Sequence, residues 1–188
     1  MHDHQHHHFK YDPVQRMKIL NPNDILKSIG LKEGMCFIDL GCNDGFFTLP
    51  AAKIVGDRGQ VIALDIDEEA LNRLRQKIEQ EKITNTTIIH SAAEKTLPYK
   101  NIADVIFFGT VLHDFKDPIK VLKNSKKILK ENGLIYNLDW QKTQTEIGPP
   151  YDIRLSIDDV RKLAEEAELS FKSSKNISNL FYEVILKN

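Results

Sequence analysis

Residues 36–46 read CFIDLGCNDGF, an apolar run that passes directly into a turn bounded by two glycines. The run Cys36–Leu40 is short and almost wholly apolar, which predicts a buried strand. Gly41 and Gly45 then allow backbone conformations that other residues resist, so the chain can leave the strand sharply and approach a ligand closely. Residues 46–55 read as a helix. A helix that begins there offers free N–H groups to whatever binds at the turn.

Strand and helix patterns alternate through the rest of the chain. Further strands are predicted at residues 61–65, 86–90, 103–108, 134–138, 169–174 and 180–186. Helices are predicted from Asn21-Pro22 to Gly30, over 70–78 after Asp67, over 119–129 after Asp117-Pro118, and from the Ser156–Asp159 capping box to Ala167. This alternation predicts an α/β fold with a parallel sheet covered on both faces. Only a short turn separates the last two strands, so we expect them to pair antiparallel.

Composition sets the broad class. The chain has 188 residues, which fits one domain, and 26 basic against 27 acidic side chains give a formal net charge of −1. That balance argues against a dominant surface for nucleic acid or anionic membranes, although it leaves room for a local basic patch. No apolar run approaches the roughly 20 residues of a membrane helix, and no signal peptide is visible. Two cysteines form no disulfide framework, so a cytoplasmic setting is expected.

Acidic residues follow the first two predicted strands, at Asp39 and Asp65. In an open α/β sheet, ligands bind at the carboxyl ends of the strands, where a carboxylate in the position of Asp65 suits ribose hydroxyls. The first turn does not fit a dinucleotide fingerprint, because that pattern needs glycine at Asn43 and glycine or alanine at Phe46.

Five motifs in order resemble class I S-adenosylmethionine-dependent methyltransferases, in the branch that resembles the ubiquinone/menaquinone-biosynthesis enzymes. They are residues 37–45, 61–67, 93–99, 103–113 with Asp117-Pro118, and 128–134. The resemblance implies a Rossmann-like doubly wound sheet of seven strands in the order 3-2-1-4-5-7-6, with one antiparallel strand, and S-adenosyl-L-methionine as cofactor. The cofactor-binding residues that it implies are Asp39, Gly41, Cys42, Asn43, Gly45, Asp65, Ile66, Ala93, Glu94 and Gly109.

Two positions depart from the family pattern. The middle glycine of the first motif is Asn43 here, and asparagine tolerates a left-handed backbone better than most residues do. The acid that often precedes the Ala-Glu pair is Ala92, so adenine contact is expected from backbone N–H groups and Glu94. No metal site is predicted.

Candidate catalytic residues follow the fourth strand. His113 and Asp114 stand near the expected position of the methyl group, where His113 is a candidate base or substrate orienter. The alternative is a structural polar residue at a helix entrance. Trp140 is likewise either part of a substrate pocket or an ordinary half-buried aromatic residue. Cys42 is not expected to act as a redox thiol.

We divide the chain into a tail and candidate lid at 1–20, which includes Phe9, Tyr11 and Arg16, and a methyltransferase domain at 21–188. The leading interpretation is methyl transfer to a small molecule, with no membrane partner and with a homodimer still open. An RNA or protein methyltransferase is the first alternative. It is disfavoured because the sequence shows no evident basic stripe and no Asn/Asp-Pro-Pro-aromatic motif at 109–112. A non-catalytic module that binds S-adenosylmethionine is the second.

Overall fold

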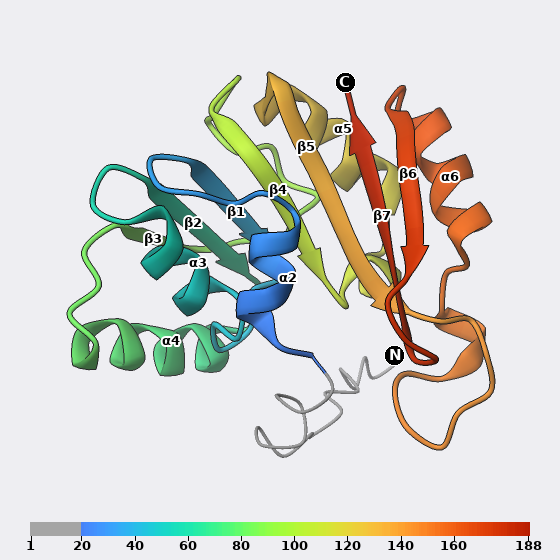
Figure 1. The fold of residues 1–188 in the computed structure, drawn as a ribbon, viewed down its shortest axis with the longest axis horizontal. Helices are drawn as coiled ribbons and strands as arrows, with labels where there is room; N and C mark the ends of the chain where they lie inside the picture. The colour runs from blue at the N-terminus through green and yellow to red at the C-terminus, as the bar shows by residue number, and fades with distance from the viewer. Residues whose placement is uncertain (1–19) are drawn as a thin grey trace.

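The computed structural model describes residues 20–188, which form one seven-stranded sheet (Figure 1). Its strands are β1 (Cys36–Leu40), β2 (Gln60–Asp65), β3 (Thr86–His90), β4 (Ala103–Gly109), β5 (Leu129–Trp140), β6 (Ser170–Asn176) and β7 (Phe181–Lys187). The order is β3-β2-β1-β4-β5-β7-β6. Strands β1 to β5 pair in parallel, and β7 pairs antiparallel with both β5 and β6. The predicted topology is therefore confirmed.

Helices cover both faces of the sheet. They are α2 (Pro22–Ser28), α3 (Thr48–Val55), α4 (Glu68–Gln80), α5 (Pro118–Ile128) and α6 (Ile157–Glu166), with short 3-10 turns η1 (Leu112–Asp114) and η2 (Tyr151–Ile153). Alternate strand residues face opposite cores: Phe37 packs with α2 and α3, whereas Ile38 packs with α5 and α6. Figure 1 accordingly shows α2 in front of the sheet and α5 behind it.

Capping residues fix where the helices begin. The side chain of Asn21 accepts a hydrogen bond from the Asn23 N–H, and Asp67 accepts from the N–H groups that follow it. Ser156 and Asp159 form the predicted capping box at α6. These starts are confirmed, whereas α3 begins at Thr48 rather than Phe46 because residues 41–47 are turns.

One strand is longer than the sequence predicts, and one connection agrees with the prediction. Strand β5 starts at Leu129, five residues before the predicted 134, and it ends at Trp140. Residues 91–102, between β3 and β4, contain no helix, as their short length predicts. These residues lie instead as an extended segment alongside α5, with the Asn101 N–H donating to the Lys127 carbonyl at 3.2 Å.

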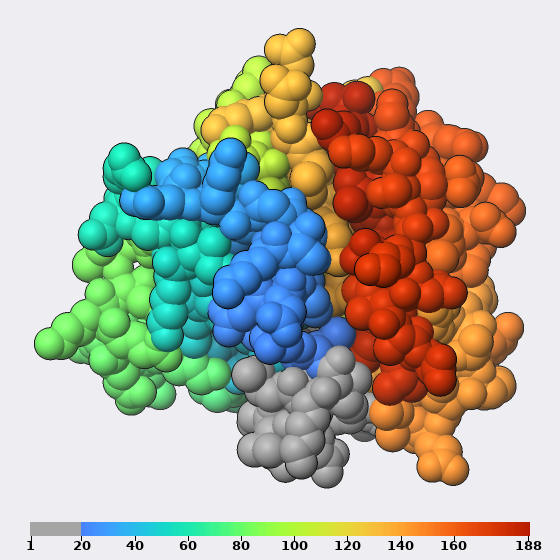
Figure 2. Space-filling model, in the orientation of Figure 1, coloured from blue at the N-terminus to red at the C-terminus, as the bar shows by residue number. Residues whose placement is uncertain are grey.

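The predicted tail and lid fall outside the described residues, apart from Leu20. Leu20 is buried against the cluster that α2 and α3 form with the sheet. In the space-filling view, α2 covers the centre of this face between α3 and the β6–β7 hairpin (Figure 2). Among residues 20–188 no helix is long and apolar enough to cross a membrane.

Candidate cofactor and methyl-transfer site

The turn after β1 is a left-handed loop at the carboxyl edge of the sheet. Gly41, Asn43 and Gly45 all have positive φ, at 80°, 47° and 91°. A side chain at Gly41 would meet Val111 Cγ2 at 2.6 Å, so the loop closes directly over the residues that follow β4. Asn43 adopts the left-handed backbone that its residue type tolerates, and its Oδ1 accepts from the Asp44 N–H at 2.8 Å. The turn therefore keeps its shape without the family's middle glycine.

Asp65 ties this loop to the end of β2. Its Oδ2 accepts the Asn43 N–H at 2.7 Å, and its Oδ1 accepts the Asp67 N–H at 2.9 Å. A carboxylate has about four acceptor positions, so acceptor capacity remains for further donors such as a pair of vicinal hydroxyls. Ile66 is 49% exposed beside it, an unusual position for a large apolar side chain. The predicted ribose acid and its apolar neighbour thus border the same turn.

Asp39 lies deeper than the sequence suggested. Its side chain is 2% exposed, and its Oδ2 accepts the Thr48 hydroxyl at 2.7 Å. A buried carboxylate needs such donors because desolvation is otherwise costly. Asp39 consequently joins the end of β1 to the start of α3 underneath the turn.

Cys42 contributes its carbonyl to the turn, and its thiol donates to the Asn43 carbonyl at 3.6 Å. The thiol packs with Ala63, Leu71 and Leu74, and burial raises its pKa well above the ordinary value. The thiolate, which is the reactive form, is therefore disfavoured. The expectation that Cys42 is not a redox thiol is consistent with this burial.

Ala93 and Glu94 belong to the segment that lies along α5. Ala93 is buried in the core, while the Glu94 Oε1 accepts the Lys116 N–H at 3.2 Å and its carbonyl accepts Asn124 Nδ2 at 3.0 Å. Gly109, at the end of β4, could not carry a side chain without meeting the rings of Phe107 and Phe47.

His113 forms a buried pair with an acid that the sequence analysis did not assign as catalytic. Its Nδ1 lies 2.7 Å from Asp139 Oδ1, and the two side chains are 3% and 0% exposed. Burial alone lowers the pKa of an imidazole, but the Asp139 carboxylate outweighs it and the pKa of His113 is raised. Asp114 is largely exposed and stands 3.5 Å from His113 Nε2. The sequence shows these two residues only as neighbours of two separate strand ends. The sheet topology brings them together, because it places the end of β5 beside the residues after β4.

Trp140 and Arg154 organise the connection between β5 and α6. Trp140 is 7% exposed and packs against Phe181, with the Arg154 guanidinium 5.5 Å from its ring centroid, so it is a packed aromatic residue. Arg154 donates to the carbonyls of Pro149, Gln141, Thr143 and Ile147 and to the Thr145 hydroxyl. No sequence pattern announced this arginine, because its partners are spread along an irregular loop.

Comparisons with known proteins show which protein family this chain is similar to. Residues 31–183 match the profile of a family described as a methyltransferase domain. A demethylmenaquinone methyltransferase of Shouchella clausii is 31% identical over 136 residues, which cover 69% of this chain and 57% of the relative. A ubiquinone/menaquinone biosynthesis C-methyltransferase of a Shewanella species is 30% identical over 119 residues, covering 63% and 47%. The chain thus spans about half the length of these curated relatives.

Solved structures share nearly the whole fold. The crystal structure of a SAM-dependent methyltransferase from Aquifex aeolicus superposes with a TM-score of 0.85 at 28% identity, covering 94% of this chain and 98% of that one. A putative type 11 methyltransferase from Sulfolobus solfataricus gives a TM-score of 0.73 at 25% identity, covering 89% and 91%.

Proposed function

Since the chain belongs to the methyltransferase-domain family, we propose that its carboxyl-edge site binds S-adenosylmethionine and transfers a methyl group to a small molecule. The observation that carries the proposal is the left-handed turn 41–45, held by Asp65 through its Oδ2, while its Oδ1 accepts the Asp67 N–H. An acid with acceptor capacity to spare, next to exposed Ile66, suits a ribose and an adenine face. Gly41, Asn43, Gly45 and Asp65 would hold the nucleoside.

Bound S-adenosylmethionine supplies an electrophilic methyl group on a sulfonium. The protein must hold the acceptor in line with that group and exclude water. We propose that His113 Nε2 accepts the proton that the acceptor loses. Asp139 fixes the imidazole through Nδ1 and stabilises the imidazolium that forms, the division of roles seen in other His–Asp pairs. Exposed Asp114, 3.5 Å from Nε2, would stabilise the imidazolium once Nε2 carries the proton.

The acceptor class follows from the same pair and from the relatives' names. A buried imidazole with a raised pKa suits an acceptor that loses a mildly acidic proton, such as a phenol or an enol. One relative is named a demethylmenaquinone methyltransferase, and another a ubiquinone/menaquinone biosynthesis C-methyltransferase. We therefore propose an electron-rich aromatic ring of the hydroquinone type as the methyl acceptor.

Calorimetry tests the cofactor proposal directly. S-adenosylmethionine and S-adenosylhomocysteine should bind at micromolar concentration, whereas a nicotinamide dinucleotide, as control, should not bind. Absence of adenosyl binding in the folded protein would refute the proposed site and leave fold-level analogy alone.

Turnover separates an enzyme from a non-catalytic binding module. With a naphthohydroquinone probe kept reduced, we expect methylated product, and His113→Gln should lower kcat about 100-fold or more with cofactor affinity unchanged. Equal turnover in the two proteins would remove His113 from the chemistry. We also propose that the protein works in a reducing compartment such as the cytoplasm, in keeping with its two free thiols.

A further inference from the structure

Six lysines gather on one side of the molecule, along α5 and the neighbouring segment 91–102. These residues, called the lysine face below, are Lys95, Lys100, Lys116, Lys120, Lys123 and Lys127, and all six are exposed. The sequence shows no evident basic stripe but leaves room for a local basic patch. These lysines are dispersed in sequence, and the fold collects them.

Helical geometry puts three of the six in one row. At about 100° per residue, Lys120, Lys123 and Lys127 fall on one side of α5, roughly opposite buried Val121 and Leu122. Lys116 precedes the helix, and the other two lysines come from segment 91–102. Its attachment to α5 through Asn124 and through the Lys127 carbonyl makes the two rows one continuous surface.

These lysines differ from much of the basic surface in lacking carboxylate partners. Elsewhere, ion pairs neutralise side chains such as Lys77 with Asp44, Lys126 with Glu168, and Lys130 with Asp104. Within residues 20–188 no ion pair involves a member of the lysine face. The acids at its edge, Glu94 and Asp117, accept backbone N–H groups at the start of α5.

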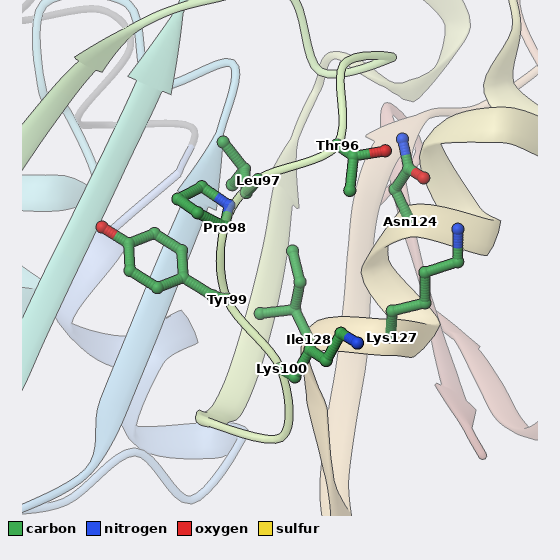
Figure 3. A pocket seen from close by; sticks show the side chains of 8 residues that line it. All are labelled: Thr96, Leu97, Pro98, Tyr99, Lys100, Asn124, Lys127 and Ile128. Carbon is green, nitrogen blue, oxygen red and sulfur yellow. The ribbon is translucent and has the colours of Figure 1, made fainter.

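An apolar hollow opens within the lysine face. It has a volume of about 470 Å³ and is lined by Thr96, Leu97, Pro98, Tyr99, Lys100, Asn124, Lys127 and Ile128. Figure 3 shows Thr96 facing Asn124, with Lys100 and Lys127 flanking the opening near Ile128. Two lysines therefore flank a hollow whose apolar lining is Leu97, Pro98, Tyr99 and Ile128.

We propose that the lysine face docks the protein on an anionic lipid bilayer. Clustered lysines are attracted to anionic headgroups without needing a fixed geometry. Nucleic acid is disfavoured because its recognition favours arginine, and this face has none. A protein partner is disfavoured because lysine is depleted from protein interfaces. Peripheral docking departs from the expected absence of a membrane partner, which rested on the balanced net charge and on the lack of an apolar run of membrane length.

The lysine face lies next to the proposed methyl-transfer site, so docking would also position that site. Lys116 lies three residues after His113, so one end of the lysine face borders the proposed methyl-transfer site, and the other end follows α5 away from it. A docked molecule would hold that site next to the membrane surface. The docking proposal itself does not depend on the chemistry proposed for the site.

Vesicle binding tests the proposal. The wild-type protein is mixed with phosphatidylcholine vesicles that contain or lack phosphatidylglycerol, and sedimentation measures the bound fraction without cofactor or acceptor. The test variant carries Lys120→Gln, Lys123→Gln and Lys127→Gln. A matched control carries Lys162→Gln, Lys172→Gln and Lys175→Gln, three exposed lysines on α6 and β6 that change net charge equally.

We expect the wild type and the control to bind only the anionic vesicles, and to release as salt rises from about 50 to about 300 mM. Each lysine removed from the face should lower partitioning about fivefold, so the test variant should lose roughly 100-fold. Unchanged thermal unfolding shows that the variant is folded. No binding by the wild type, equal binding to neutral vesicles, equal loss in the control, or tighter binding to a single-stranded RNA would each overturn the proposal.

Discussion

Replacing Asp65 with alanine removes a carboxylate that serves both the protein and the proposed ligand. In the folded protein it accepts the Asn43 N–H at 2.7 Å and the Asp67 N–H at 2.9 Å. In the proposed complex its remaining acceptor capacity receives ribose hydroxyls. The substitution should therefore lower both the stability of the protein and its affinity for the cofactor. The two losses can be estimated and measured separately.

The stability loss comes from two hydrogen bonds to a charged acceptor, each contributing about 1.5–3 kcal/mol when well shielded. Asp65 is only partly buried, so water replaces part of each bond, and a total of about 2–3 kcal/mol is expected. At roughly 2–4 °C per kcal/mol for a chain of this size, Tm should fall by about 5–10 °C. Loss of the ribose acceptor should weaken binding by about 1–3 kcal/mol, or roughly 5–150-fold in Kd.

Calorimetric titration with S-adenosylhomocysteine well below Tm measures the affinity, and calorimetric melting measures the stability. Asp67→Ala is the matched control, because Asp67 caps α4 through the Glu69 and Ala70 N–H groups, two and three residues further on. The control should lose about 1 kcal/mol of stability with little change in Kd. A folded Asp65→Ala variant that binds within twofold of the wild type would refute the assignment of Asp65 to the ribose. A control that loses as much affinity would show that loop stability, not the acceptor, sets Kd.

Two further substitutions test the loop and the buried pair. Gly45→Ala should lower the free energy of unfolding by about 2–3 kcal/mol and weaken cofactor binding, because the backbone is left-handed and the new methyl meets Leu74. The control Gly34→Ala is also left-handed but lies in open space, so it should lower that free energy by only about 1 kcal/mol. Urea unfolding measures both. Asp139→Asn should cost about 2–3 kcal/mol at pH 6 and less at pH 9. The pKa of His113 is raised in the folded protein, so its protonation stabilises the fold. That stabilisation is fully present below the ordinary histidine pKa of about 6.5 and is lost as pH rises through the folded pKa. A cost of Asp139→Asn in urea unfolding that does not change with pH would contradict the charged pair.

The order of elements was predictable because the signals are local. Asn21, Asp67 and Ser156 bond to N–H groups two or three residues away, and each one marked its helix correctly. Strand order is a different matter: periodicity reports which residues are buried but not which strands are neighbours. The placement of β7 between β5 and β6 was available only from the family resemblance.

The site was predictable where it depends on one turn and not where it depends on two strands meeting. Residues 41–45 carry their own conformational signature, so the loop and the acid after β2 were found from sequence. The partnership of His113 with Asp139 spans 26 residues and exists only because β4 and β5 are adjacent in the sheet. The same reasoning explains the lysine face, whose members come from two segments brought together by hydrogen bonds at Asn124 and Lys127.

Arg154 shows how the chain can give an irregular loop a defined shape. Five donor groups on a rigid guanidinium match acceptors spread over residues 141–149, and the guanidinium stays buried against Trp140. Lysine could not reproduce this arrangement, because its three donors diverge from one point. The loop begins at Gln141, two residues after Asp139, the residue that holds His113. A well-ordered loop at this position would limit the freedom of the proposed His–Asp pair, so substrate choice and proton transfer should both respond to changes in a residue that contacts neither.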